Sequence, residues 1–107
     1  MAPFEGVWNV ERLGGFLPPL VGMRKRISGT RGKTVVGPLR MSFEVRGNEL
    51  HYHPPFTGFV DQLEVVDQDH VRGRATFRGR EYGRFELTRI GGQATAEAAL
   101  TEEGISV

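Results

Sequence analysis

The chain has no cysteine among its 107 residues, which excludes disulfide bonds and thiolate chemistry and fits a reducing compartment. No run approaches the roughly 18 apolar residues that a membrane-spanning helix needs. No positively charged start followed by an apolar stretch marks a secretory signal. The formal net charge is only +1, which gives no general attraction to nucleic acid or anionic membranes. We therefore expect a cytoplasmic protein with neither nucleic acid nor membrane as a partner.

Glycine and proline, by contrast, are plentiful: the chain has 15 glycines and six prolines. Many of them separate short runs in which apolar and polar residues alternate. Alternation is typical of half-buried strands, because successive side chains point to opposite faces of a sheet. A chain of this length forms one domain with a single modest core. The pattern therefore predicts an all-β domain built from many short strands.

The clearest alternation lies in residues 59–90, FVDQLEVVDQDHVRGRATFRGREYGRFELTRI, which predicts three consecutive antiparallel strands. The apolar sets share one face only if each connecting loop holds an odd number of residues. Three-residue loops at 67–69 and 78–80 meet this condition. They place Gly73 opposite Phe85, so that a large ring covers the space left by a strand glycine.

The same register pairs Phe59 with Phe77 on the apolar face. It also brings Asp61 onto that face, opposite Ala75. An inward carboxylate costs free energy unless it is paired, hydrogen-bonded or protonated. Asp61 is therefore the first residue for which we expect a special role.

Two hairpins precede this region. Residues 23–30 and 33–37 are expected to form one around Arg31-Gly32, with Lys25 facing inward or at the rim. Residues 40–46 and 49–53 form a second, whose two-residue turn at Gly47-Asn48 pairs Phe43 with Tyr52.

The first strand, residues 4–13, alternates with Trp8 on its apolar face. About eight short strands linked by short turns are expected to hide their edges by closing into a small antiparallel up-and-down β-barrel over residues 1–90. Such a barrel has room inside for side chains or one small ligand. The apolar residues 14–22 are expected to form either a hydrophobic cap or a gate over one end. Residues 91–107 are expected to be a tail or a short helix.

Gly6-Val7-Trp8 in the first strand, with the inward-parity Arg89 near the end of the last, resembles the ends of the lipocalin-like (calycin) barrels. A guanidinium over the face of Trp8 would add a cation–π contact at the closed end. The resemblance implies that the interior binds a small apolar ligand, or that an enzyme uses the same cavity.

The candidate site is the set of side chains that the parity turns inward. Ligand sites have this composition, mostly apolar walls with a few convergent polar groups. Its predicted ligand-binding residues are Trp8, Lys25, Phe43, Tyr52, Phe59, Asp61, Phe77, Phe85 and Arg89. The alternative is structural: the inward polar residues would form an internal ion pair or network that closes the barrel.

Two other patterns have simpler explanations. His51 and His53 share a strand face at a spacing that can chelate a metal, as in cupin-type barrels, but no third ligand is identifiable. We therefore expect no metal. The arginines of residues 72–84 could touch phosphates, but predicted cross-strand glutamates neutralise them, and the aromatics mostly fall on the opposite face.

Three functions remain open. The leading hypothesis is a non-enzymatic barrel that binds a small apolar molecule inside and needs no cofactor. The second is an interaction module, either a filled barrel or two half-barrels completing one another as a homodimer. The third is a small isomerase or cyclase in which Asp61, its pKa raised by burial, acts as general acid or base.

Overall fold

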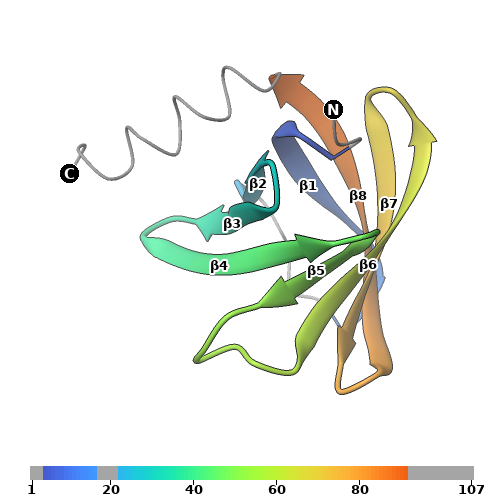
Figure 1. The fold of residues 1–107 in the computed structure, drawn as a ribbon. Helices are drawn as coiled ribbons and strands as arrows, with labels where there is room; N and C mark the ends of the chain where they lie inside the picture. Colours follow the sequence, from blue (N-terminus) through green and yellow to red (C-terminus); the bar gives the residue numbers. More distant parts are fainter. Residues whose placement is uncertain (1–3, 17–21, 92–107) are drawn as a thin grey trace.

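The computed structural model describes residues 4–16 and 22–91, and they form a closed β-barrel (Figure 1). Each strand runs antiparallel to the next, and the last pairs back with the first. The strands are β1 (Gly6–Gly15), β2 (Arg24–Ser28), β3 (Arg31–Val36), β4 (Leu39–Arg46), β5 (Glu49–Tyr52), β6 (Phe59–Asp67), β7 (His70–Phe77) and β8 (Arg80–Gly91). The predicted all-β, up-and-down barrel of eight strands is confirmed.

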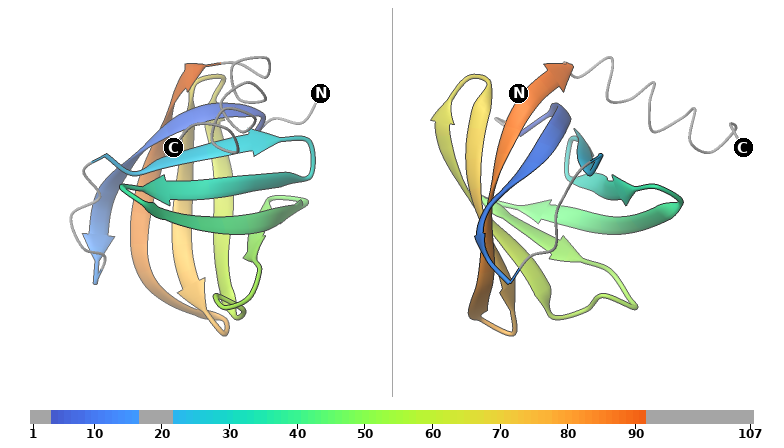
Figure 2. Two further views of the ribbon diagram at one scale, coloured as in Figure 1. Left: turned by 90° about the vertical axis from the view of Figure 1, so that its left-hand side faces the viewer. Right: turned by 180° about the vertical axis from the view of Figure 1, so that it is seen from behind.

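The barrel is flattened rather than round. Figure 2 shows β2, β3 and β4 running across β6, β7 and β8 at a steep angle, so the two groups of strands face each other as layers. Side chains from both layers fill the space between them, and the largest fully buried ones are Trp8, Phe43, Ile27, Leu50, Leu87, Val71 and Thr34. In the part of the chain that the structure describes, no helix is long and apolar enough to cross a membrane.

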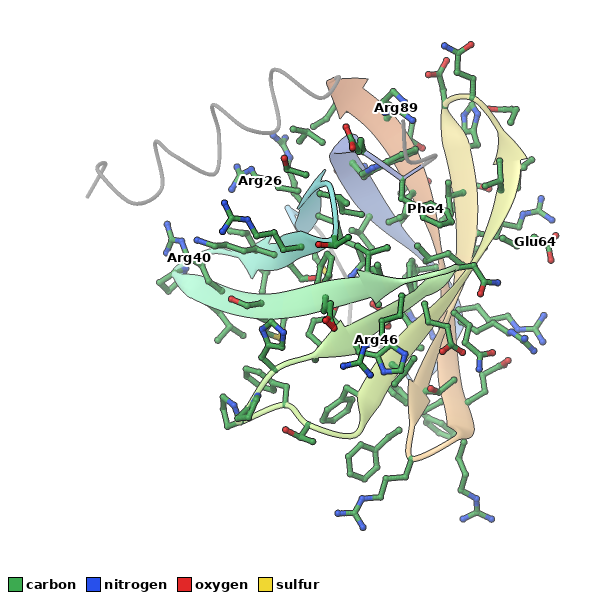
Figure 3. The ribbon with its side chains drawn as sticks, in the orientation of Figure 1. Phe4, Arg26, Arg40, Arg46, Glu64 and Arg89 are labelled. Carbon is green, nitrogen blue, oxygen red and sulfur yellow. The ribbon has the colours of Figure 1, made fainter. Side chains whose placement is uncertain are left out.

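Trp8 lies at the seam where the barrel closes. Its indole nitrogen donates a hydrogen bond of 2.8 Å to the carbonyl of Phe4. The Arg89 guanidinium lies 4.2 Å from the centre of the indole ring and also donates to the carbonyl of Glu5. Figure 3 labels Arg89 near the end of β8. The predicted cation–π contact between the first and last strands is therefore present.

The predicted pairing of the central strands is correct, but both turns that join them are shorter than expected. Gly73 lies opposite Phe85 and Asp61 opposite Ala75. Between β6 and β7, Asp67 pairs with His70 across Gln68-Asp69, and a register shift between Val65 and Asp67 keeps the parity.

Between β7 and β8, Phe77 pairs with Arg80 across the two-residue turn Arg78-Gly79, where both residues have positive φ, as a tight hairpin turn of this kind requires. The register then shifts past Ala75. The extra residue of this bulge restores the parity that a three-residue loop would have given.

The turn between β2 and β3 is also displaced. Ser28 pairs with Arg31, so the turn lies at Gly29-Thr30 and not at Arg31-Gly32. The sequence is misleading because Gly32 looks like a turn glycine, whereas it is a strand glycine under the ring of Phe43. A Cβ on Gly32 would lie 2.7 Å from that ring.

The ends of two predicted segments differ from expectation or lie outside the described residues. β1 continues through Gly14 and Gly15, where the sequence predicted a break, because Gly15 still pairs with Gly83 on β8. Phe16, which follows, is 94% exposed. The rest of the predicted cap, residues 17–21, and the predicted tail or helix after Gly91 are outside the described part of the chain.

Candidate functional site

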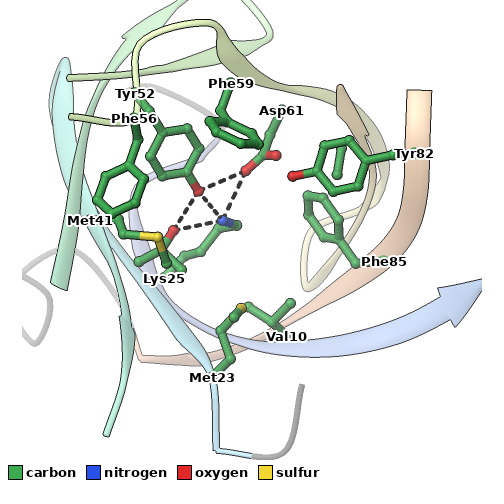
Figure 4. Close-up of a pocket in the computed structure, with 12 residues that line it drawn as sticks. Val10, Met23, Lys25, Met41, Tyr52, Phe56, Phe59, Asp61, Tyr82 and Phe85 are labelled. Atoms are coloured by element: carbon green, nitrogen blue, oxygen red, sulfur yellow. Dashed lines mark hydrogen bonds and ion pairs between the residues drawn. The ribbon is translucent and has the colours of Figure 1, made fainter. Parts of the chain in front are cut away.

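An interior pocket of about 270 Å³ lies beside the packed core (Figure 4). Its floor consists of buried side chains: Val10, Lys25, Thr34, Asp61, Ala75 and Phe85. Its rim consists of half-buried ones: Met23, Met41, Tyr52, Phe56, Phe59 and Tyr82. The gradient from a buried floor to a half-exposed rim means that the pocket reaches solvent on one side. Its walls are mostly apolar, and the polar groups are concentrated in one place.

That place is a hydrogen-bonded network around the ammonium group of Lys25. The Lys25 Nζ donates to Thr34 Oγ1 at 2.7 Å, to the Tyr52 hydroxyl at 2.7 Å and to Asp61 Oδ2 at 2.9 Å. The Tyr52 hydroxyl also donates to Asp61 Oδ2 at 2.9 Å and lies 2.6 Å from Thr34 Oγ1. An ammonium has three N–H donors, so this network uses all of those on Lys25.

Strand alternation explains why the network forms. Lys25 on β2 pairs with Thr34 on β3, and Asp61 on β6 lies opposite Leu50 on β5, two residues before Tyr52. Each of these residues falls on the inward parity of its own strand, so all their polar groups meet inside. The charged pair is sequestered, because the side chains of Lys25 and Asp61 are 3% and 7% exposed.

Burial and charge fix the protonation of the two tyrosines. Burial raises the pKa of Tyr52 well above its usual 10, and the negative charge of Asp61 raises it further. The pKa of Tyr82 is raised for the same two reasons, burial first and Asp61 second. Both hydroxyls therefore keep their protons at neutral pH and remain hydrogen-bond donors. The Lys25 ammonium also lies 5.3 Å from the centre of the Phe85 ring, a cation–π distance.

Five of the predicted ligand-binding residues line this pocket: Lys25, Tyr52, Phe59, Asp61 and Phe85. Trp8 and Phe43 are fully buried in the core beside it. Phe43 contacts two lining residues, Tyr52 edge to face at 5.4 Å and the Lys25 ammonium at 5.7 Å from its ring centre. Arg89 lies over Trp8 and is not among the lining residues.

Phe77 has the predicted register opposite Phe59, but it does not line the pocket. Its side chain is 38% exposed, and its ring packs 4.6 Å from that of Phe59. Phe77 is the last residue of β7, so correct parity carries it past the end of the barrel interior, beside the rim. Arg78 covers it from outside at 5.4 Å.

Other lining residues were missed, and each for an identifiable reason. Thr34 was missed because its hairpin was placed two residues too late, which pairs it with Gly29 instead of Lys25. Tyr82 reaches the pocket from the bulge on β8, which alternation alone does not reveal. Phe56 lies in the loop after β5, where no strand pattern exists to place it.

The two remaining candidates, the His51–His53 pair and the arginines of residues 72–84, lie on the outer surface of the barrel. His51 is 3.0 Å from the Glu49 carboxylate. Within residues 4–16 and 22–91, no three His, Asp or Glu side chains are grouped so as to hold a metal ion. Arg72 and Arg74 on β7 lie 3.5 Å and 4.0 Å from Glu86 and Glu81 on β8, respectively, which agrees with the expected cross-strand neutralisation.

Fold and pocket together define the class of this protein as a closed eight-stranded antiparallel barrel with a mostly apolar interior pocket and a buried Lys–Asp–Tyr network. Compared with protein-family models, curated proteins and solved structures, the chain matches none of them.

Proposed function

We propose that this protein is a calycin-like barrel that binds one small, uncharged and largely apolar molecule in its interior pocket. The observation that carries the proposal is the pocket itself, about 270 Å³ of space walled mainly by aromatic, methionine and aliphatic side chains. Pockets that bind small molecules have this composition, with a few convergent polar groups that orient the ligand.

The charge balance of the pocket supports an uncharged occupant. Lys25 and Asp61 neutralise each other at 2.9 Å, so a ligand with a net charge would bring an unpaired charge into an apolar space. The position of Arg89 over Trp8, together with Gly6-Val7-Trp8, supports the calycin-like assignment.

The alternative of two half-barrels that complete one another has less support, because β1 pairs with β8 within a single chain. A filled core is also disfavoured by the pocket. An acid–base role for Asp61 stays a prediction, and its Oδ2 is already occupied by Lys25 and Tyr52.

Native mass spectrometry of the purified protein tests the proposal. We expect either a co-purified small molecule at one per chain, released under denaturing conditions, or saturable binding of added naphthalene to the empty protein. If the protein carries no bound molecule and also shows no saturable uptake of naphthalene, ligand binding in the pocket is contradicted.

A matched pair of variants localises the binding. Ala75→Leu places a larger side chain on the pocket floor and is expected to abolish naphthalene uptake while the barrel stays folded by circular dichroism. Ser42→Leu adds similar bulk on the exposed outer face of β4 and is expected to leave the uptake unchanged. Equal binding by both variants would place the ligand elsewhere.

A further inference from the structure

The Asp61 carboxylate uses only one of its two oxygens within the network. The hydrogen bonds from Lys25 and from Tyr52 both end on Oδ2. Within residues 4–16 and 22–91, no side chain or backbone group donates to Oδ1. Asp61 is only 5% exposed, but its Oδ1 is not fully buried, so this oxygen is accessible from the pocket. The pocket therefore presents a hydrogen-bond acceptor that a ligand can use.

The Tyr82 hydroxyl is the second polar group that faces the pocket without a hydrogen bond in the described part of the chain. Figure 4 shows it pointing toward the free oxygen of Asp61 across the pocket. The bulge on β8 explains this: Asp61 lies opposite Ala75, Ala75 lies opposite Gly83, and Tyr82 is the extra residue of the bulge beside Gly83. A tyrosine hydroxyl can both donate and accept. The two groups therefore fit a ligand group that donates to one and accepts from the other.

The network around Lys25 disfavours the binding of ligands that carry a charge. All three of its N–H donors are used by protein groups, so a ligand carboxylate finds no free donor there and meets the negative charge of Asp61. A ligand ammonium would add a second cation next to Lys25 and compete for the same carboxylate. A hydroxyl group satisfies both Asp61 and Tyr82 without adding charge.

The size of the pocket limits the rest of the ligand. An engineered cavity of about 150 Å³ binds benzene, and this pocket measures about 270 Å³. By proportion it has room for about two fused six-membered rings. The aromatic walls of Phe59, Phe85 and Tyr82 suit a flat ring system.

We propose that the pocket is specific for an uncharged, ring-containing alcohol or phenol, whose hydroxyl donates to Asp61 Oδ1 and accepts from the Tyr82 hydroxyl. This inference rests on the proposed function, since it names the ligand class of the same pocket.

Calorimetric titration with three probes of one shape tests it: naphthalene, 1-naphthol and 1-naphthoate. We expect 1-naphthol to bind about tenfold more tightly than naphthalene, equivalent to about 1.4 kcal/mol, and 1-naphthoate to bind most weakly. Equal affinities for naphthol and naphthalene, or tightest binding of naphthoate, would overturn the hydroxyl specificity while leaving ligand binding intact. No binding of any probe would overturn the proposed function as well.

The Tyr82→Phe variant tests the geometry, because it removes one hydroxyl and keeps the ring. We expect the preference for 1-naphthol over naphthalene to fall from about tenfold to about threefold. Ser42→Ala, on the exposed face of β4, should keep the full preference. An undiminished preference in Tyr82→Phe would exclude Tyr82 as a partner of the ligand hydroxyl and overturn the arrangement.

NMR spectroscopy can also show that 1-naphthol binds in this pocket. The chain has only two tyrosines and one tryptophan. Both tyrosines line the pocket, whereas Trp8 does not. Binding of 1-naphthol should therefore shift the NMR resonances of the two tyrosine rings and leave those of Trp8 nearly in place. The opposite pattern would contradict binding at this site.

Discussion

The Lys25–Asp61 pair matters for stability mainly because neither charge is left unpaired inside the barrel. Removing one partner of a buried pair leaves the other charge uncompensated and typically costs about 3–5 kcal/mol. We expect Lys25→Met to lower the free energy of unfolding by about that amount, measured by urea denaturation. The double variant Lys25→Met with Asp61→Asn removes both charges and should recover part of the loss.

A second ion pair of similar length serves as the control. Arg46 lies 2.8 Å from Glu44, but these side chains are 65% and 39% exposed. Exposed pairs contribute about 0–1 kcal/mol, so Arg46→Met should change the free energy of unfolding by less than about 1 kcal/mol. Equal effects of Lys25→Met and Arg46→Met would show that burial does not govern the strength of these pairs.

His70 and Asp67 form a surface pair that should make stability depend on pH. A hydrogen bond and the charge of Asp67 raise the pKa of His70 above its usual 6.5, and the same bond lowers the pKa of Asp67 below 3.8. A raised His70 pKa gives stability that is fully present below pH 6.5 and lost as the pH rises through the folded value. A lowered Asp67 pKa gives stability present above pH 3.8 and lost at more acidic pH. The pair should therefore stabilise the fold most between these limits.

An NMR titration of the His70 ring measures this directly. We expect its pKa to lie above 6.5 in the native protein and to fall toward 6.5 in Asp67→Asn. A native His70 pKa at or below 6.5, or one unaffected by Asp67→Asn, would contradict the pairing.

At the level of the strands, two glycines make room for the aromatic rings that fill the barrel. Gly73 on β7 lies directly beneath the ring of Phe85, and a Cβ there would clash with that ring. Phe85 also lines the pocket, so the same glycine determines how far the ring protrudes into the space for a ligand.

Gly73→Ala is expected to destabilise the protein by about 1–3 kcal/mol, the usual cost of overpacking. It should also weaken naphthalene binding, because the displaced ring occupies part of the pocket. Gly14→Ala is the control, since a Cβ on Gly14 has no neighbour within 4 Å, and it should change stability by less than about 0.5 kcal/mol. Urea denaturation measures both variants. Equal losses in the free energy of unfolding for Gly73→Ala and Gly14→Ala would contradict this account.

Alternation predicted the strands and their facing better than it predicted their turns. The inward face depends only on whether the number of intervening residues is odd, so the register of Gly73 with Phe85 is correct although the turn at Arg78-Gly79 is shorter than predicted. A bulge and a longer loop have the same effect on parity, and sequence alone does not distinguish them. At Gly32, alternation could not locate the turn, because a turn glycine and a strand glycine look the same in sequence.

For the whole molecule, the candidate site could be predicted only where strand parity applies. Asp61, Lys25 and Tyr52 were placed inside by parity, and they do meet. An internal ion pair among the inward polar residues was one of the two predicted alternatives, and Lys25 and Asp61 form such a pair. Which residues would pair was not predictable, because that depends on how far each strand is displaced along the barrel. Phe77 shows the same limit in reverse: its parity is inward, yet it lies at the end of the interior and is 38% exposed.

Closure of the barrel is the last structural step that we expect during folding, because it joins the most distant parts of the described chain. Arg89 on β8 contacts the Glu5 carbonyl, 84 residues away in sequence, and its guanidinium covers Trp8. Contacts between such distant segments are slow to form because closing a long loop is entropically costly. Interactions made after the rate-limiting barrier affect unfolding rather than folding.

Arg89→Met therefore tests the order of events. It removes the cation–π contact, the hydrogen bonds to the carbonyls of Glu5 and Gln68, and the 3.5 Å ion pair with Asp69. We expect a loss of about 2 kcal/mol. If the seam forms last, unfolding should accelerate about 30-fold, since about 1.4 kcal/mol is a factor of ten, and the folding rate should stay nearly constant. Stopped-flow fluorescence of Trp8, the only tryptophan, measures both rates. Arg72→Met, which breaks an exposed pair with Glu86, should change neither rate appreciably. A folding rate that falls by the same factor would instead place the seam in the folding nucleus, and the two ends of the chain would then meet before the rest of the barrel is complete.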